Sequence, residues 1–258
     1  NQKLLEQSIG RYLRECYDLS ARARTINSDS GFDAAHWGFF AEMGLLGLPF
    51  AEADGGFDGE LADAMLVARL FGEALVVEPY HEAVIQAGRL LAFSTSAEQK
   101  SRWLVPLIAG ESLITLAHLE RDGRPDGSAL KTRLSARDNK LYLTGTKCLV
   151  ALPDSVDAVV VTARDDDGDT VLCVVPLSSP GLSVRRYRSI DGRRCADLHF
   201  DGVEVPADNI LVLTDPQAAL ADVIAYGEAC LCSEAIGIMA ALHKMTVDYS
   251  RTRTQFGQ

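Results

Sequence analysis

The sequence predicts an α+β protein of three parts: an N-terminal all-α domain (residues 1–112), a middle antiparallel β-sandwich or barrel domain (113–213) and a C-terminal helical segment (214–258). The spacing of apolar residues carries this prediction. In the first part they recur at steps of three and four, which is the period of an amphipathic helix. In the middle part the period becomes two, which indicates strands, and the helical period then returns.

The first part contains four apolar faces at helical spacing. They run from Leu4 to Cys16, from Phe32 to Leu46, from Leu61 to Leu75 and from Val84 to Leu91. Pro49 ends the second of these helices, since proline cannot continue one.

Two further features complete the helical part. Thr95-Ser-Ala-Glu98 has the form of a capping box, which predicts a short helix that begins after Thr95 and carries Trp103. The glycine-rich loop of residues 53–59 has no strand before it, so we interpret it as a connector between helices rather than as a phosphate cradle.

The middle part alternates apolar and polar residues between turn signals. Residues 130–136 and 140–149 flank the turn Arg137-Asp-Asn139, which predicts a hairpin. Residues 158–163 and 171–176 flank the acidic turn Asp165 to Asp169. With the alternation at 113–117, 182–186 and 198–205, this gives about six to eight short strands, which is typical of an antiparallel sandwich or barrel.

A long helix closes the chain. Asp215 before Pro216 is a good start signal, because proline is tolerated at the first helical position. One continuous apolar stripe follows, made of Leu220, Ile224, Leu231, Ile238, Leu242, Met245 and Tyr249. Arg251 and Arg253 then suit the end of a helix, or alternatively Arg253 binds a phosphate with its planar fork of donors.

The composition excludes several classes of protein. The 25 Lys and Arg against 36 Asp and Glu give a formal net charge of −11, which argues against nucleic acid and against anionic membrane surfaces as partners. No apolar run reaches the roughly 18 residues of a membrane span. The six cysteines are scattered, no Cys/His cluster has zinc spacing, and no signal peptide pattern is present, so we expect a cytoplasmic protein without a metal site.

Five segments, in order along the chain, resemble motifs of the acyl-CoA dehydrogenase family. They are residues 37–49 with Asp54-Gly-Gly56, residues 98–111, residues 143–147, Ile190-Asp-Gly192 with residues 200–210, and Tyr249-Ser-Arg-Thr-Arg-Thr-Gln-Phe-Gly257. The resemblance implies a truncated acyl-CoA dehydrogenase fold, FAD as cofactor, an acyl-CoA substrate, and a homologous subunit in a dimer or tetramer. It also implies, by analogy, electron-transfer flavoprotein as the electron acceptor.

The resemblance also implies contacts to the cofactor. In the family the last segment crosses a dimer interface to the ADP half of the FAD held by the neighbour, which points to Arg253, Gln255 and Phe256. The β domain of the family forms one wall of the flavin site, and the corresponding positions here are Gly127, Ser128, Leu149 and Val150.

That flavin wall departs from the family pattern. Leu119-Glu-Arg121 stands where Thr-Glu-Pro is expected, and Cys148-Leu-Val150 stands where an aromatic residue and then a hydroxyl residue are expected. A valine cannot donate a hydrogen bond to flavin N5, and a leucine cannot replace a hydroxyl. Lys147, just before, is interpreted as structural.

The catalytic base is not evident. Most of the family carries it beyond the segment that ends this chain, and a minority carries it on the long helix about ten residues before a glycine such as Gly237. Glu228 lies nine residues before Gly237 and is the candidate, although a one-residue step turns a helical side chain by about 100°. Glu234 lies on the same helix and matches no such precedent.

The favoured hypothesis is a subunit of an FAD-dependent acyl-CoA dehydrogenase that catalyses or supports α,β-desaturation of an acyl-CoA. Within it, we favour a degenerate subunit that completes a partner's FAD site, as in heteromeric enzymes of actinobacterial steroid side-chain degradation, and that is inactive alone. The alternatives are a self-sufficient homotetramer with its base in a missing C-terminal segment, and a non-catalytic scaffold subunit.

Overall fold

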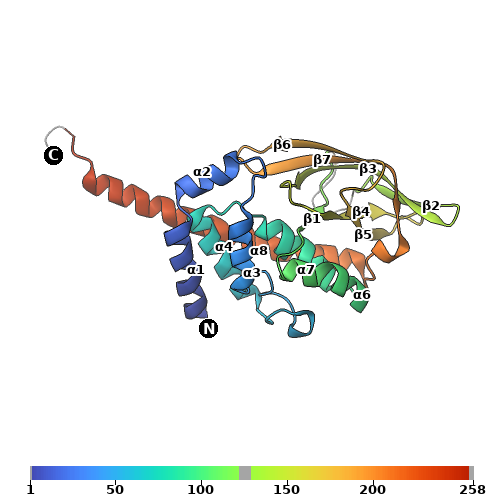
Figure 1. Cartoon of the computed structure of the whole chain (residues 1–258), viewed down its shortest axis with the longest axis horizontal. Helices are drawn as coiled ribbons and strands as arrows, with labels where there is room; N and C mark the ends of the chain where they lie inside the picture. The colour runs from blue at the N-terminus through green and yellow to red at the C-terminus, as the bar shows by residue number, and fades with distance from the viewer. Residues whose placement is uncertain (1, 122–128, 256–258) are drawn as a thin grey trace.

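The computed structural model describes residues 2–121 and 129–255, and it has the predicted order of helices, sheet and long helix (Figure 1). The first part contains α1 (Gln2–Cys16), α2 (Leu19–Asn27), α3 (Ala34–Glu42), η1 (Glu52–Asp54), α4 (Leu61–Ala74), η2 (His81–Gly88), α5 (Arg89–Ala92), α6 (Ala97–Gln99), η3 (Lys100–Leu104) and α7 (Val105–Ile108). The first, third and fourth predicted apolar faces lie on helices, and η2 and η3 are π-helical stretches. The second helix is shorter than predicted, since α3 ends at Glu42 and turns, rather than helix, lead to Pro49.

The predicted capping box is wrong by one residue. The residue that caps α6 is Ser96, whose hydroxyl accepts from the Gln99 N–H at 3.2 Å and donates to Glu98. The hydroxyl of Thr95 instead donates to the Val212 carbonyl oxygen, a contact between residues far apart in the sequence.

The strands form a single curled sheet in the order β1-β4-β2-β3-β7-β6, with β5 paired to β4 (Figure 1). Their bounds are β1 (Ile114–Ala117), β2 (Arg133–Arg137), β3 (Lys140–Ala151), β4 (Ala158–Arg164), β5 (Thr170–Pro176), β6 (Leu182–Arg188) and β7 (Arg194–Val205), followed by η4 (Ala207–Asn209). Most pairings are antiparallel, as predicted, but β1 and β2 each pair with β4 in parallel. The predicted hairpin is present, with Asp138 and Asn139 both at positive φ, as a two-residue type I′ turn requires.

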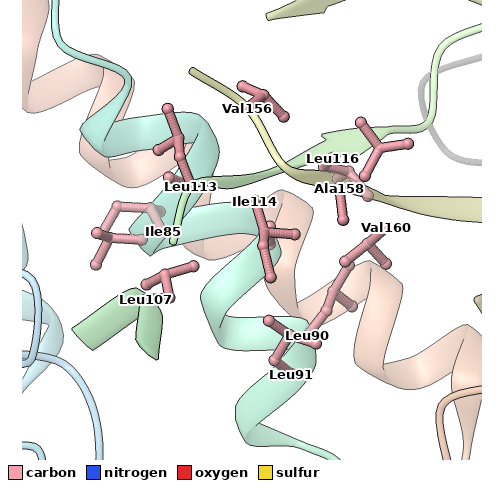
Figure 2. Close-up of a cluster of buried hydrophobic side chains, with 14 of the residues drawn as sticks. Ile85, Leu90, Leu91, Leu107, Leu113, Ile114, Leu116, Val156, Ala158 and Val160 are labelled. Carbon is pink, nitrogen blue, oxygen red and sulfur yellow. The ribbon is translucent and has the colours of Figure 1, made fainter. Parts of the chain in front are cut away.

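Helices and sheet share one apolar core (Figure 2). Leu90 and Leu107 pack from α5 and α7 against Ile114 of β1 and Val160 of β4, and all four are fully buried. Because this core is continuous, the sheet is held in a fixed position on the helices.

The long helix α8 (Pro216–Thr252) begins as predicted, with Asp215 accepting from the Ala218 N–H. It packs on α4 with almost no side chain between the two backbones. A Cβ on Gly237 would overlap the Arg69 carbonyl oxygen, and one on Gly72 would overlap the carbonyl oxygen of Glu234. At the same crossing, the Ser233 hydroxyl of α8 donates to the Met65 carbonyl oxygen of α4 at 2.7 Å.

The apolar stripe predicted for α8 is not its buried face. Leu220 is buried, but Leu231, Leu242, Met245 and Tyr249 are 46–59% exposed. The face that packs on the protein consists instead of mostly small residues, namely Val223, Gly227, Cys230, Ser233 and Gly237. The C-terminal end of the helix projects from the body of the molecule (Figure 1).

Length and composition alone would also allow α8 to cross a membrane. The contacts of its first half with α4 and η2 give its apolar composition a role within the fold. The exposed apolar stripe of its second half is expected to pack against another protein surface, because a contiguous apolar surface of this kind marks an interaction site.

The helix crossing predicts a large difference between two glycine substitutions. Gly237→Ala is expected to lower the free energy of unfolding by about 1–3 kcal/mol, because the two backbones must separate. Gly38→Ala on α3 is the matched control, since nothing lies within 4 Å of its added Cβ, and it is expected to stabilise by up to about 1 kcal/mol. Urea denaturation followed by circular dichroism measures both, and equal effects would contradict the crossing geometry.

Candidate functional site

The residues implied as cofactor contacts lie in separate parts of the chain. Leu149 and Val150 belong to the end of β3, whereas Arg253 and Gln255 follow the end of α8. The projecting end of α8 points away from the sheet (Figure 1), so the two groups do not form one site within this chain. Gly127, Ser128 and Phe256 lie outside the described residues.

A buried ion pair supports the sheet next to Leu149. The Lys147 side chain is fully buried, and its Nζ lies 2.8 Å from Oε1 of Glu120 and 3.1 Å from the Thr162 hydroxyl. Glu120 also accepts from the N–H groups of Lys131 and Thr132, at 2.7 and 3.0 Å. Because their charged groups are bonded to one another and to the sheet backbone, Lys147 and Glu120 have a structural role.

The protonation states of this pair follow from its surroundings. Burial favours the neutral carboxyl of Glu120, but hydrogen bonds from Lys147, the Lys131 N–H and Thr132 outweigh it, so the pKa of Glu120 is lowered. Burial lowers the pKa of Lys147, although Glu120 beside it acts in the opposite direction. The hydrogen bonds therefore keep the carboxylate of Glu120 ionised inside the sheet.

A β-bulge presents Leu149 at the surface. The register between β3 and β7 shifts between Lys147 and Val150, and Leu149 has a φ of +54° and is 59% exposed. Its backbone N–H donates to the Tyr187 hydroxyl at 3.1 Å, and that hydroxyl donates to Oδ1 of Asp197 at 2.8 Å. The side chain of Val150 is only 2% exposed and lies in the core.

This face does not fit a flavin ring well. Val150 is buried and cannot meet a ligand, and the N–H of Leu149 already has a partner in Tyr187. Asp197 adds negative charge, and together with burial, which acts most strongly, it raises the pKa of the Tyr187 hydroxyl. We therefore derive no flavin chemistry on the described residues of this sheet.

The long helix offers no free buried carboxylate at the position implied for a base. The side chain of Glu228 is exposed. Gly227, ten residues before Gly237, faces η2 instead, and a Cβ there would lie 3.3 Å from the His81 ring. Glu234 points inward but is 3.3 Å from the guanidinium of Arg193. The role of Glu228 as a base stays a prediction.

The C-terminal segment presents polar groups to the solvent. Arg253 is the C-cap residue of α8, its guanidinium lies 5.2 Å from the ring of Tyr249, and both Arg253 and Gln255 are exposed. A planar fork of donors at the tip of a projecting helix suits a phosphate of another molecule.

Models of two protein domains match most of the sequence. The N-terminal domain of acyl-CoA dehydrogenase matches residues 1–111, and the middle domain of acyl-CoA dehydrogenase matches residues 115–203. The chain belongs to the acyl-CoA dehydrogenase family. Its N-terminal helical domain, middle β domain and following long helix are those of the acyl-CoA dehydrogenase fold, which confirms the fold class predicted from the sequence.

Individual relatives agree with this family. The probable acyl-CoA dehydrogenase YngJ of Bacillus subtilis is 24% identical over 270 residues, which cover 100% of this chain and 70% of YngJ. Other curated acyl-CoA dehydrogenases, such as FadE27 of Mycobacterium tuberculosis, are covered over only 58% of their length.

Solved structures of acyl-CoA dehydrogenases share the fold. The ChsE4–ChsE5 complex from Mycobacterium tuberculosis and the Tcur3481–Tcur3483 steroid ACAD both give a TM-score of 0.87, at 23% and 24% identity, with 100% of this chain and 68% of theirs covered. A glutaryl-CoA dehydrogenase from Mycobacterium smegmatis, solved with FADH2, gives 0.86 at 20% identity, covering 98% of this chain and 67% of that chain. The prediction of FAD as the cofactor is thus confirmed for the family.

The sequence alone did not indicate Tyr187, which bonds the Leu149 N–H, or Arg193, which lies at the junction next to α8. Tyr187 lies on β6, where the alternation drew attention to Leu182, Val184 and Arg186 instead. Arg193 follows the family-like Ile190-Asp-Gly192, and that position was the available signal. The partners of both residues are distant in the sequence, so no local pattern reveals them.

The buried ion pair predicts unequal effects of one substitution at two lysines of β3. Lys147→Met is expected to lower the free energy of unfolding by about 3–5 kcal/mol, because it leaves the Glu120 carboxylate buried without its counter-charge. Lys140→Met is the matched control, since Lys140 pairs with Glu204 at 2.9 Å on the surface and its loss is expected to leave the urea midpoint nearly unchanged. Similar midpoints for the two variants would show that the buried pair is not needed.

Proposed function

We propose that this chain is a subunit of an FAD-dependent acyl-CoA dehydrogenase and supports α,β-desaturation by completing the FAD site of a homologous partner. One contrast carries the proposal. On the sheet face that would hold a flavin of its own, the backbone N–H of Leu149 is already bonded to Tyr187 and Val150 is buried, whereas Arg253 and Gln255 are exposed at the tip of a projecting helix. Donor groups placed beyond the body of their own chain are suited to a ligand on a neighbour.

In the partner's site, the contacts would follow from the chemistry of the groups. The guanidinium of Arg253 would bind the pyrophosphate, with Gln255 and Phe256 beside it. FAD, when bound, accepts the hydride removed from the acyl-CoA. The present chain contributes binding and orientation to that reaction.

The second half of α8 supports association with a partner. Its exposed apolar residues Leu242, Met245 and Tyr249 recur at steps of three and four, so they share one side of the helix. A helix end without tertiary contacts is only marginally stable in water, and burial of this stripe against another chain would stabilise it. We propose a homologous subunit as that chain.

The nature of the complex is part of the proposal. The ChsE4–ChsE5 complex and the Tcur3481–Tcur3483 steroid ACAD have this fold, which supports a heteromer and a steroid side-chain CoA as the substrate class. Electron-transfer flavoprotein is the proposed acceptor by analogy, and the cytoplasm the proposed location. The alternative proposal is a self-sufficient homotetramer with its base in a C-terminal segment, and a longer open reading frame that contains a downstream glutamate would support it.

The role of Arg253 can be tested by replacing it in the complex. Arg253→Ala is expected to weaken FAD binding by about 10- to 100-fold, because a charge-assisted contact to a phosphate is lost. Arg251→Ala is the matched control, since Arg251 is also exposed, two residues earlier on the same helix. FAD fluorescence titration of the apo-complex measures both. If Arg253→Ala binds FAD like the unchanged complex, the flavin role of this segment is wrong.

A further inference from the structure

Arg193 lies where the helical part, the sheet and α8 meet. It belongs to the turn between β6 and β7, and its guanidinium reaches Glu82 of η2 at 3.5 Å and Glu234 of α8 at 3.3 Å. It also donates to the Val76 carbonyl oxygen at 3.2 Å and pairs with Asp191 at 3.5 Å. A single side chain thus connects three segments that are far apart in the sequence.

Arg193 partly neutralises the negative charges that meet at this junction. Three carboxylates lie within 3.5 Å of the guanidinium, so without it they would repel one another. Burial would lower the pKa of Arg193, but Glu82, Glu234 and Asp191 outweigh this effect and raise it. Burial lowers the pKa of His81, which also lines the junction, so the imidazole is not a second cation there at neutral pH.

The space enclosed at the junction is very small. Its volume is about 20 Å³, and it is lined by Phe71 of α4, Tyr80 and His81, Arg193, and Cys230 and Glu234 of α8. Sites for small organic ligands usually measure about 300–1,000 Å³, whereas about 10–15 Å³ holds one water molecule. Glu78, which is 3% exposed, also lines it, and the Oε1 atom of Glu78 has no hydrogen-bond partner among the described residues. The volume therefore suits one water molecule and no acyl chain.

The preceding turn of α8, at Gly227, also has no space for a ligand. Gly227, Cys230 and Glu234 follow at steps of three and four, so they share one face of the helix. A Cβ added at Gly227 would lie 3.3 Å from the His81 ring, so the ring covers this position of the helix. Ten residues before Gly237, the position that a family minority uses for its base, this chain therefore has a glycine covered by histidine.

We propose that Arg193 seals the junction between η2, the β6–β7 turn and α8, so that this chain forms no acyl-binding cleft there and leaves acyl-CoA binding to its partner. The inference rests on the proposed function, because it concerns the acyl site of the same complex. It adds that the junction next to α8 has no room for the acyl chain of the substrate.

The cysteines of α8 report on this seal. Cys230 lines the junction and is 1% exposed, and burial raises the pKa of its thiol to about 11, while Cys232, two residues later, is exposed. In the complex treated with N-ethylmaleimide, we expect Cys232 to react readily and Cys230 to be protected. Arg193→Ala is expected to raise the rate at Cys230 by at least about tenfold and to leave Cys232 unchanged, as measured by mass spectrometry.

Two further variants control this experiment. Arg186→Ala removes an exposed arginine of β6 that pairs with Asp154, and it is expected to leave Cys230 protected. Glu234→Gln keeps the shape of the junction but removes one charge of the pair, so we expect a smaller rise than for Arg193→Ala, in a chain that still folds. Equal reactivity of the two cysteines before any substitution, or continued protection of Cys230 in Arg193→Ala, would overturn the proposal.

Acyl-CoA itself gives the second readout. A fatty acyl-CoA carrying a diazirine on its chain is photolysed with the complex, and the label is mapped by mass spectrometry. Label on the partner chain alone supports a sealed junction, and label on η2 or α8 of this chain overturns it. Neither result depends on Arg253, so failure here is distinguishable from failure of the proposed flavin contact.

Discussion

The contact of the α4 and α8 backbones at Gly72 and Gly237 is the constraint on which the rest of the structure depends. Each glycine faces a carbonyl oxygen of the other helix, so the crossing admits no larger residue without a shift of one backbone. This close approach sets the position of α8. It brings Glu234 to Arg193 on one side of the crossing and directs the C-terminal end of the helix away from the body.

The two ends of α8 therefore have opposite roles. Its first half is used within the chain, where Arg193 and His81 cover the face that a catalytic helix would need to leave open. Its second half contributes nothing to the core and exposes an apolar stripe with Arg253 at its end. At the sheet, Tyr187 accepts the hydrogen bond of the Leu149 N–H. Among the described residues, these groups are therefore paired within the chain, whereas those at the end of α8 are exposed.

Much of the fold follows from local signals in the sequence. Asp215-Pro216 marked the start of α8, and Asp138-Asn139 the hairpin turn, because their chemistry acts over only a few residues. The buried face of α8 could not be predicted in this way, since hydrophobic periodicity selects leucines, whereas the packed residues are mostly small. The site was less predictable still. Tyr187 and Leu149, or Arg193 and Glu234, meet only after the chain has folded.

The central claim is that this chain serves a flavin held by another subunit. The most direct measurement is the flavin absorbance of the purified chain, alone and after co-expression with candidate homologous subunits. We predict a colourless protein alone and a yellow complex with the correct partner. Full FAD occupancy and dehydrogenase activity of the chain alone would contradict it.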